Sequence, residues 1–177
     1  MRPSTDMIAT VQPLIPALRR YARALLRDRD DADDLVQDVL ERATANWAGR
    51  RKGGTARAWL FAILHNLAMD RLRRRMRRGV DDPIDEVSEA RLASPPQQED
   101  GFGQRDVMAL LGQLPDEQRS VLLLVGVEEL SYAEAAAILD IPQGTVMSRL
   151  SRGRERLRRL MEEGADGPAR PYLRIVS

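Results

Sequence analysis

Guanidinium groups and short hydroxyls share one helical face between positions 148 and 154 of this chain. The side chains on this face are Ser148, Arg149, Ser151, Arg152 and Arg154. A guanidinium can donate two hydrogen bonds to the edge of a guanine, and both kinds of group can donate to phosphate oxygens. Such a face suits the major groove of a DNA duplex. The alternative is a solvated helical hairpin whose arginines merely face water.

Two helices are needed to position this face. Ser131 and Glu134 form a capping box, which predicts that a short helix begins at Tyr132 and continues to Leu139. Pro142 cannot continue that helix but suits the first turn of a second one. The apolar residues of the second helix recur at spacings of three, four and seven, and these are Val146, Leu150, Leu157, Leu160 and Met161. Two helices and a tight turn are the arrangement of a helix-turn-helix.

A second cationic group ends a longer predicted helix, for which Thr55 is a plausible N-cap. The arginines of this group are Arg71, Arg73, Arg74, Arg75, Arg77 and Arg78. So dense a run of like charge predicts a surface that binds a polyanion. Cations that complement the helix dipole would explain one or two of these arginines, but not six.

The helix predicted over residues 31–47 has the opposite charge. Its first turn carries acidic residues, which the helix dipole favours. Its outer face continues with Gln37, Asp38 and Glu41. Capping alone does not explain the last two carboxylates, and an ordinary solvated face remains the alternative.

Composition narrows the function classes. Cysteine is absent and histidine occurs once, which excludes thiol catalysis, disulfides and Cys/His zinc sites. We expect no cofactor, and His65 is no catalytic candidate. The 28 basic and 27 acidic residues nearly balance in number, but they are segregated along the chain. The most apolar run, 121–127, is too short to span a bilayer, so we expect a cytoplasmic protein without membrane insertion.

The segments predict an all-α fold of two small helical domains joined by a flexible acidic linker. The first domain covers residues 1–78 and the second 105–163, with a linker over 79–104 and a tail over 164–177. Residues 1–12 are weakly patterned and are expected to be frayed. The linker composition, rich in acidic residues, proline and glycine, does not bury a core.

Residues 114–158 resemble region 4 of the extracytoplasmic-function (ECF) sigma factors. The resemblance rests on LP followed by EQR, then SYAEAA, then GTVMSRLSRGRERLR, in that order. The earlier strings DADDLVQDVLERA and WLFAILHNLAMDRLRRRMRR are similar to regions 2.2 and 2.3–2.4 of the same family. Two positions depart from the family pattern. Met147 stands where a basic residue is frequent, and Gly153 replaces an alanine, which costs roughly 1 kcal/mol of helix propensity and predicts a less rigid helix.

The resemblance implies three partners: core RNA polymerase, promoter DNA and an anti-sigma factor. It implies that the −35 element is read by Thr145, Ser148, Arg149, Ser151, Arg152 and Arg154. It implies that the −10 element is bound by Trp59, Asn66, Arg73, Arg74 and Arg77. It implies that core polymerase is bound by Asp34, Leu35, Gln37, Asp38 and Glu41. The acidic linker would mimic RNA charge inside the polymerase, unless it is only a solubilising tether.

These expectations describe a sigma factor that works by binding and catalyses no reaction. One alternative is an autonomous helix-turn-helix regulator, which would bind operators without polymerase. Another is a nuclease, although no carboxylates form a convincing metal-binding cluster near the basic surfaces.

Overall fold

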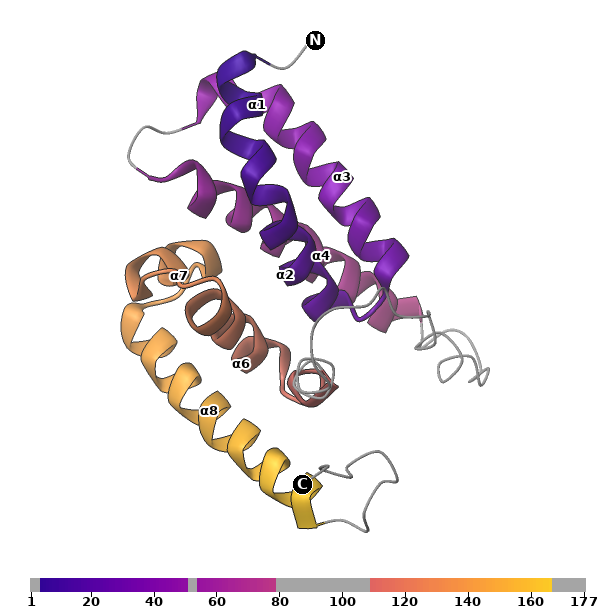
Figure 1. Cartoon of the computed structure of the whole chain (residues 1–177), viewed down its shortest axis with the longest axis vertical. Helices are drawn as coiled ribbons and strands as arrows, with labels where there is room; N and C mark the ends of the chain where they lie inside the picture. Colours follow the sequence, from indigo (N-terminus) through magenta and orange to yellow (C-terminus); the bar gives the residue numbers. More distant parts are fainter. Residues whose placement is uncertain (1–3, 51–53, 79–108, 167–177) are drawn as a thin grey trace, which may run out of the picture.

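The computed structural model describes residues 4–50, 54–78 and 109–166 of the chain. All regular structure in these ranges is helical, as Figure 1 shows, so the all-α prediction is confirmed. The predicted linker over 79–104 and the end of the predicted tail lie outside the described residues. None of the described helices is both long and apolar enough to cross a membrane.

The first half of the chain is a bundle of helices around a common core. Its α-helices are α1 (Thr5–Val11), α2 (Ile15–Leu26), α3 (Arg29–Asn46) and α4 (Ala56–Arg78). Helices α2, α3 and α4 pack against one another through fully buried side chains such as Leu18, Leu35 and Leu64. Tyr21 meets Phe61 edge to face, with ring centroids 5.4 Å apart.

The expectation of a frayed lead-in over residues 1–12 is wrong for residues 5–11, which form α1. The Ser4 hydroxyl accepts the backbone N–H of Met7 at 3.2 Å and caps the helix. Met7 and Val11 are buried, and the Trp47 indole donates to Asp6 at 3.1 Å. A seven-residue helix with two apolar anchors is too short to show a clear periodicity in sequence.

Capping side chains set the start of the two long helices. Asp28 accepts the backbone N–H of Asp31 at 2.9 Å, so α3 begins at Arg29, two residues before the predicted start. Thr55 accepts the N–H of Ala58 at 3.1 Å, which confirms the predicted N-cap of α4. Arg27 adopts a left-handed conformation, with φ of 57°, and ends α2.

The second half contains the predicted helix-turn-helix. Its elements are α6 (Asp116–Val121), the π-helix η4 (Leu122–Val127), α7 (Tyr132–Leu139) and α8 (Gln143–Asp166). The capping box is present, because Glu134 N–H donates to the Ser131 hydroxyl and Ser131 N–H donates to the Glu134 carboxylate. These bonds to Ser131 lower the pKa of Glu134. Asp140, with φ of 52°, ends α7 and makes the tight turn.

Two features of this half differ from prediction. Residues 115–125 were expected to form one helix, but the chain changes to π geometry at Leu122. Helix α8 continues to Asp166, beyond its expected end at Glu163. Its apolar face includes Val146 and Leu150, as predicted, but Met161 is 51% exposed and lies outside the core.

Gly153 of α8 is buried against η4. A Cβ atom at this position would lie 2.9 Å from Cδ1 of Leu122, which is closer than carbon atoms can approach without displacement. The glycine therefore allows the two helices to approach closely. The sequence predicted only that Gly153 makes the helix less rigid. It did not predict this close contact with Leu122.

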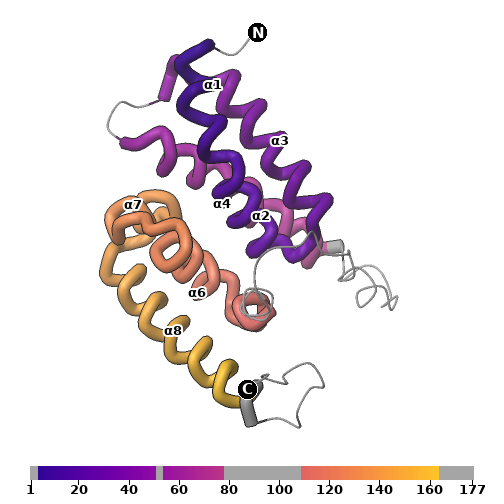
Figure 2. The backbone as a smooth tube through the Cα atoms, in the orientation of Figure 1, coloured from indigo at the N-terminus to yellow at the C-terminus, as the bar shows by residue number. Residues whose placement is uncertain are grey.

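The two halves pack against each other, which the sequence did not predict. Helix α7 contacts α4, while α2 contacts α6 and η4. Figure 2 shows the second half lying along one side of the first. Buried residues of both halves belong to one continuous hydrophobic core.

Candidate nucleic-acid interface

Three of the six side chains predicted to read DNA lie on the exposed surface of α8. Ser151, Arg152 and Arg154 are exposed, while Thr145 and Ser148 are half-buried near the start of the helix. The Ser148 hydroxyl donates to the carbonyl of Thr145 at 3.1 Å. The exposed residues lie two to three turns into α8, the second helix of the helix-turn-helix, which is the helix that enters a major groove in such proteins.

Arg149 lies in a different environment from its neighbours. Its guanidinium pairs with Glu117 of α6 at 3.0 Å, and only 25% of its side chain is exposed. Arg149 also lines a cavity together with His65 and Met69 of α4. The expectation that Arg149 faces outward is therefore wrong for this arrangement of the helices, and its contact with a base remains a prediction.

An open groove runs along α8 beside the exposed cations. It has a volume of about 500 Å³, and its lining includes Tyr132, Met147, Ser151 and Arg154. Met147 is 54% exposed. It places an apolar side chain among groups that can donate to phosphate.

Three of the predicted −10 residues, Arg73, Arg74 and Arg77, lie on the last turns of α4, while Asn66 lies in the middle of the helix. Asn66, Arg73, Arg74 and Arg77 are all exposed. Arg73 pairs with Asp70 one turn earlier, and this contact lowers the pKa of the Asp70 carboxyl. The other exposed guanidiniums of this group belong to one helix end, as a surface for a polyanion requires.

Two arginines of the predicted polyanion surface have a structural role instead. Arg71 donates to the carbonyl of Asp31 at 2.9 Å and to the Asp38 carboxylate at 2.5 Å. Arg75 pairs with Asp31 and with Asp28. The prediction of one surface made by all six arginines is therefore wrong, because these two side chains hold α4 against α3.

Trp59 and His65 belong to the packing of α4. Trp59 is half-buried and meets Trp47 edge to face, with centroids 6.1 Å apart. The buried His65 ring lies 3.1 Å from the Tyr21 hydroxyl through Nδ1. Burial, assisted by the nearby charge of Arg73, lowers the pKa of His65 to about 4, so the ring is neutral near pH 7.

The predicted polymerase-binding face of α3 is partly exposed. Asp34, Gln37 and Glu41 face solvent, and the Gln37 amide donates to Glu41 at 3.2 Å. Leu35 is fully buried in the core, so its inclusion in this surface is wrong. Asp38 is half-exposed, but its carboxylate is paired with Arg71.

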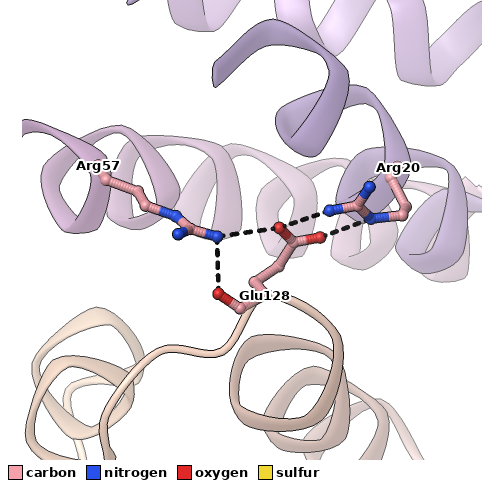
Figure 3. A network of polar contacts seen from close by, with 3 residues as sticks. All are labelled: Arg20, Arg57 and Glu128. Carbon is pink, nitrogen blue, oxygen red and sulfur yellow. Dashed lines mark hydrogen bonds and ion pairs between the residues drawn. The ribbon is translucent and has the colours of Figure 1, made fainter. Parts of the chain in front are cut away.

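A buried carboxylate that the sequence analysis missed lies between the two halves. Glu128, at the end of η4, is 1% exposed and contacts Arg20 of α2 and Arg57 of α4 (Figure 3). The sequence signal was an acidic residue directly after an apolar run. Among the described residues, no three His, Asp or Glu side chains gather as a metal site would need.

The fold and the exposed cations of α8 define a helix-turn-helix DNA-binding protein. Residues 11–65 match the family described as "Sigma2 domain of PhyR", and residues 104–157 match "Sigma-70, region 4". The chain is 39% identical over 160 residues to the ECF RNA polymerase sigma factor EcfG of Rhodopseudomonas palustris strain TIE-1, covering 90% of this chain and 87% of EcfG. It belongs to the ECF RNA polymerase sigma factor family.

Solved structures show the same fold. The sigma factor RpoE of Bartonella quintana, in complex with the anti-sigma factor NepR, is 34% identical, with a TM-score of 0.78 over 90% of this chain and 98% of RpoE. CnrH, in complex with the cytosolic domain of CnrY, is 28% identical, with a TM-score of 0.64 over 86% of this chain and 85% of CnrH.

Proposed function

We propose that this sigma factor divides its work between two DNA-binding surfaces and one polymerase-binding surface. Sigma factors direct RNA polymerase to promoters and begin transcription, and the family membership assigns this function to the chain. This proposal is supported by the way in which exposed positive and negative side chains lie on different helices. Exposed cations lie on α8 and at the end of α4, while exposed carboxylates lie on α3.

Helix α8 is the proposed reader of the −35 element. Arg152 and Arg154 can contact guanine edges or phosphates, and Ser151 can donate to either. Thr145 and Ser148 lie at the start of α8, where the helix enters the groove. Arg149 also contacts DNA in this proposal, after its ion pair with Glu117 has broken.

The end of α4 is the proposed site for the −10 element. Arg73, Arg74 and Arg77 supply the positive charge that follows a single-stranded backbone, and Asn66 supplies an amide that can bind an exposed base. Trp59 packs against Trp47 two turns away from Asn66. Its proposed contribution is therefore to support this surface.

The exposed acidic residues of α3 are the proposed contact with core polymerase. Asp34, Gln37 and Glu41 form this surface, while Asp38 contributes only when its bond to Arg71 opens. Because the enzyme and the chromosome share the cytoplasm in bacteria, we place the protein there. Its contribution to transcription is binding, with no covalent step of its own.

An anti-sigma factor is the third proposed partner. One solved structure that resembles this chain contains the sigma factor RpoE in complex with the anti-sigma factor NepR. The resemblance to RpoE extends over 90% of this chain, so it includes both halves. An inhibitor that contacts both halves together would fit this arrangement.

Transcription in vitro tests the proposed function. Core RNA polymerase is incubated with the protein and a promoter library randomised at the −35 and −10 elements. We expect selection of a two-element promoter and transcripts that depend on both proteins. Tight binding of a two-element site by the free protein would favour an autonomous regulator instead.

A further inference from the structure

Glu128 connects the two halves of the molecule through two guanidinium groups (Figure 3). Its carboxylate accepts hydrogen bonds from Nε and Nη2 of Arg20, each at 2.9 Å. Nη2 of Arg57 donates to the Glu128 carbonyl at 2.6 Å and lies 3.3 Å from its carboxylate. One residue of the second half therefore binds two helices of the first.

Other polar contacts follow the same interface. The Thr55 hydroxyl donates to Glu134 at 3.3 Å, which joins the start of α4 to α7. Tyr21 of α2 is fully buried, and this burial raises the pKa of its hydroxyl well above the ordinary value. These contacts fix a single register between the halves.

The interface also places the proposed DNA-reading helix next to α4. Arg149 of α8 lines a cavity of about 180 Å³ with His65 and Met69 of α4 and Leu139 of α7. The −35 and −10 elements of one promoter lie about two helical turns apart, on the order of 68 Å of duplex. Helices that share one cavity cannot occupy two sites so far apart, so the packed arrangement is incompatible with binding both elements.

We propose that Glu128, Arg20 and Arg57 form a clasp that holds the free sigma factor in a closed, promoter-incompetent state. Core polymerase binds the open state and shifts the population toward it. This inference rests on the proposed function, because it concerns the access of polymerase and promoter to the surfaces assigned above. The clasp is a device within the chain, and it acts without an inhibitor.

The burial of the three side chains suits a reversible clasp. Glu128 is almost completely desolvated, and such a carboxylate is tolerated only while its partners stay in place. The Arg20 and Arg57 side chains are 42% and 38% exposed, so water reaches them and can replace the carboxylate when the halves separate. RpoE in complex with the anti-sigma factor NepR matches 90% of this chain with a TM-score of 0.78, which supports the closed state as an arrangement that a sigma factor adopts in such a complex.

A reversible lock tests the proposal directly. The chain has no cysteine, so Thr55→Cys and Glu134→Cys introduce the only two thiols, at positions that touch across the interface. A short bis-maleimide linker with a cleavable disulfide joins them. We expect the locked protein to lose binding to core polymerase and transcription, and cleavage of the linker to restore both. The cleaved protein is the matched control, because it carries the same two substitutions.

The outcomes separate the clasp from the proposed function. Equal activity of locked and cleaved protein, or failure of the linker to form, would overturn the clasp while the sigma factor assignment stands. Inactivity of the wild-type protein with core polymerase would instead overturn the proposed function.

Substitutions in the clasp give a second, independent measurement. Arg20→Ala and Glu128→Gln should raise the open population, measured as longer distances between spin labels at Ala45 and Arg159, both exposed. If the open form is about one tenth of the wild-type population, opening raises the apparent affinity for core polymerase about tenfold. Arg19→Ala is the control, since Arg19 pairs with Asp33 inside the first half. Unchanged distances and affinity in both clasp variants would refute the proposal.

Discussion

Arg149 of α8 forms an ion pair with Glu117 of α6 at 3.0 Å, while Arg152 on the same helix is exposed. The two arginines should therefore respond differently to substitution. Arg152→Ala should weaken use of the preferred promoter by about 1–3 kcal/mol, the value of a bidentate guanine contact, without changing thermal stability. Arg149→Ala should lower both the use of the preferred promoter and the thermal stability. Selection on a randomised −35 library and thermal unfolding measure the two effects, and unchanged −35 preference after both substitutions would show that another face of α8 reads DNA.

Neutralising the end of α4 should impair promoter opening more than polymerase binding. Replacing Arg73, Arg74 and Arg77 with glutamine removes the exposed charge that would bind the separated strand. Permanganate footprinting of the −10 region reports opening, and fluorescence anisotropy reports association with core polymerase. Arg71→Gln is the matched control, because Arg71 pairs with Asp38 inside the domain. It should reduce stability instead, and normal opening in the triple variant would contradict the assignment of this surface.

Charge reversal on α3 should abolish association with core polymerase. Asp34→Lys with Glu41→Lys changes two exposed carboxylates that are not needed for packing. The isolated protein should retain its weak DNA affinity, measured at matched salt because phosphate contacts depend steeply on ionic strength. Asp33→Lys, one position away, faces Arg23 at 3.2 Å and serves as the control. Loss of polymerase binding in the control alone would place the docking surface elsewhere.

Gly153→Ala should destabilise the second half, although alanine favours a helix. The new Cβ would force Leu122 aside, and overpacking of this kind costs about 1–3 kcal/mol. The gain in helix propensity is only about 1 kcal/mol. In a Leu122→Ala background the obstruction is gone, so the same substitution should stabilise the protein by about 1 kcal/mol. Urea unfolding of the four proteins measures the cycle, and equal effects of Gly153→Ala in both backgrounds would refute the contact.

Stability should fall as the pH decreases from about 6.5 to 4, through His65. The ordinary pKa of the ring is 6.5, and burial lowers it to about 4 in the folded protein. The unfolded chain therefore takes up the proton first, and stability present above pH 6.5 is lost as pH falls through this window. The full effect is on the order of 3 kcal/mol. Denaturation of the wild type and His65→Gln at several pH values tests this, and the same slope in both proteins would exclude His65.

Local signals predicted most of the helices because they act over a few residues. The Ser131 capping box, the Thr55 N-cap and the break at Pro142 each depend on neighbours in the chain, and the capping bonds are present as expected. Helix α1 was missed because Met7 and Val11 become buried only when the rest of the bundle covers them. Such a contact leaves no local signal in the sequence.

The surfaces were harder to predict because charge patterns do not reveal partners across helices. Arg71 and Arg73 look alike in sequence, yet one bonds to α3 and the other to its own helix. Leu35 was predicted to belong to the polymerase-binding face of α3 together with its polar neighbours. The helical repeat instead directs its side chain into the core. Glu128 and Arg20 are 108 positions apart, and no local pattern connects them.

The π-helix η4 holds one residue more per hydrogen-bonded turn than an α-helix would. Glu128 donates its N–H to the carbonyl of Leu123, five residues earlier, at 2.9 Å, where an α-helix would bond four residues earlier. Deleting one residue between Leu123 and Glu128 would restore α geometry, because the same N–H and carbonyl would then be four residues apart. The π turn takes up the extra residue, so the positions that follow would keep their facing and Glu128 would still face Arg20. In an alignment of relatives, a single-residue gap at η4 would therefore be compatible with the same closed arrangement.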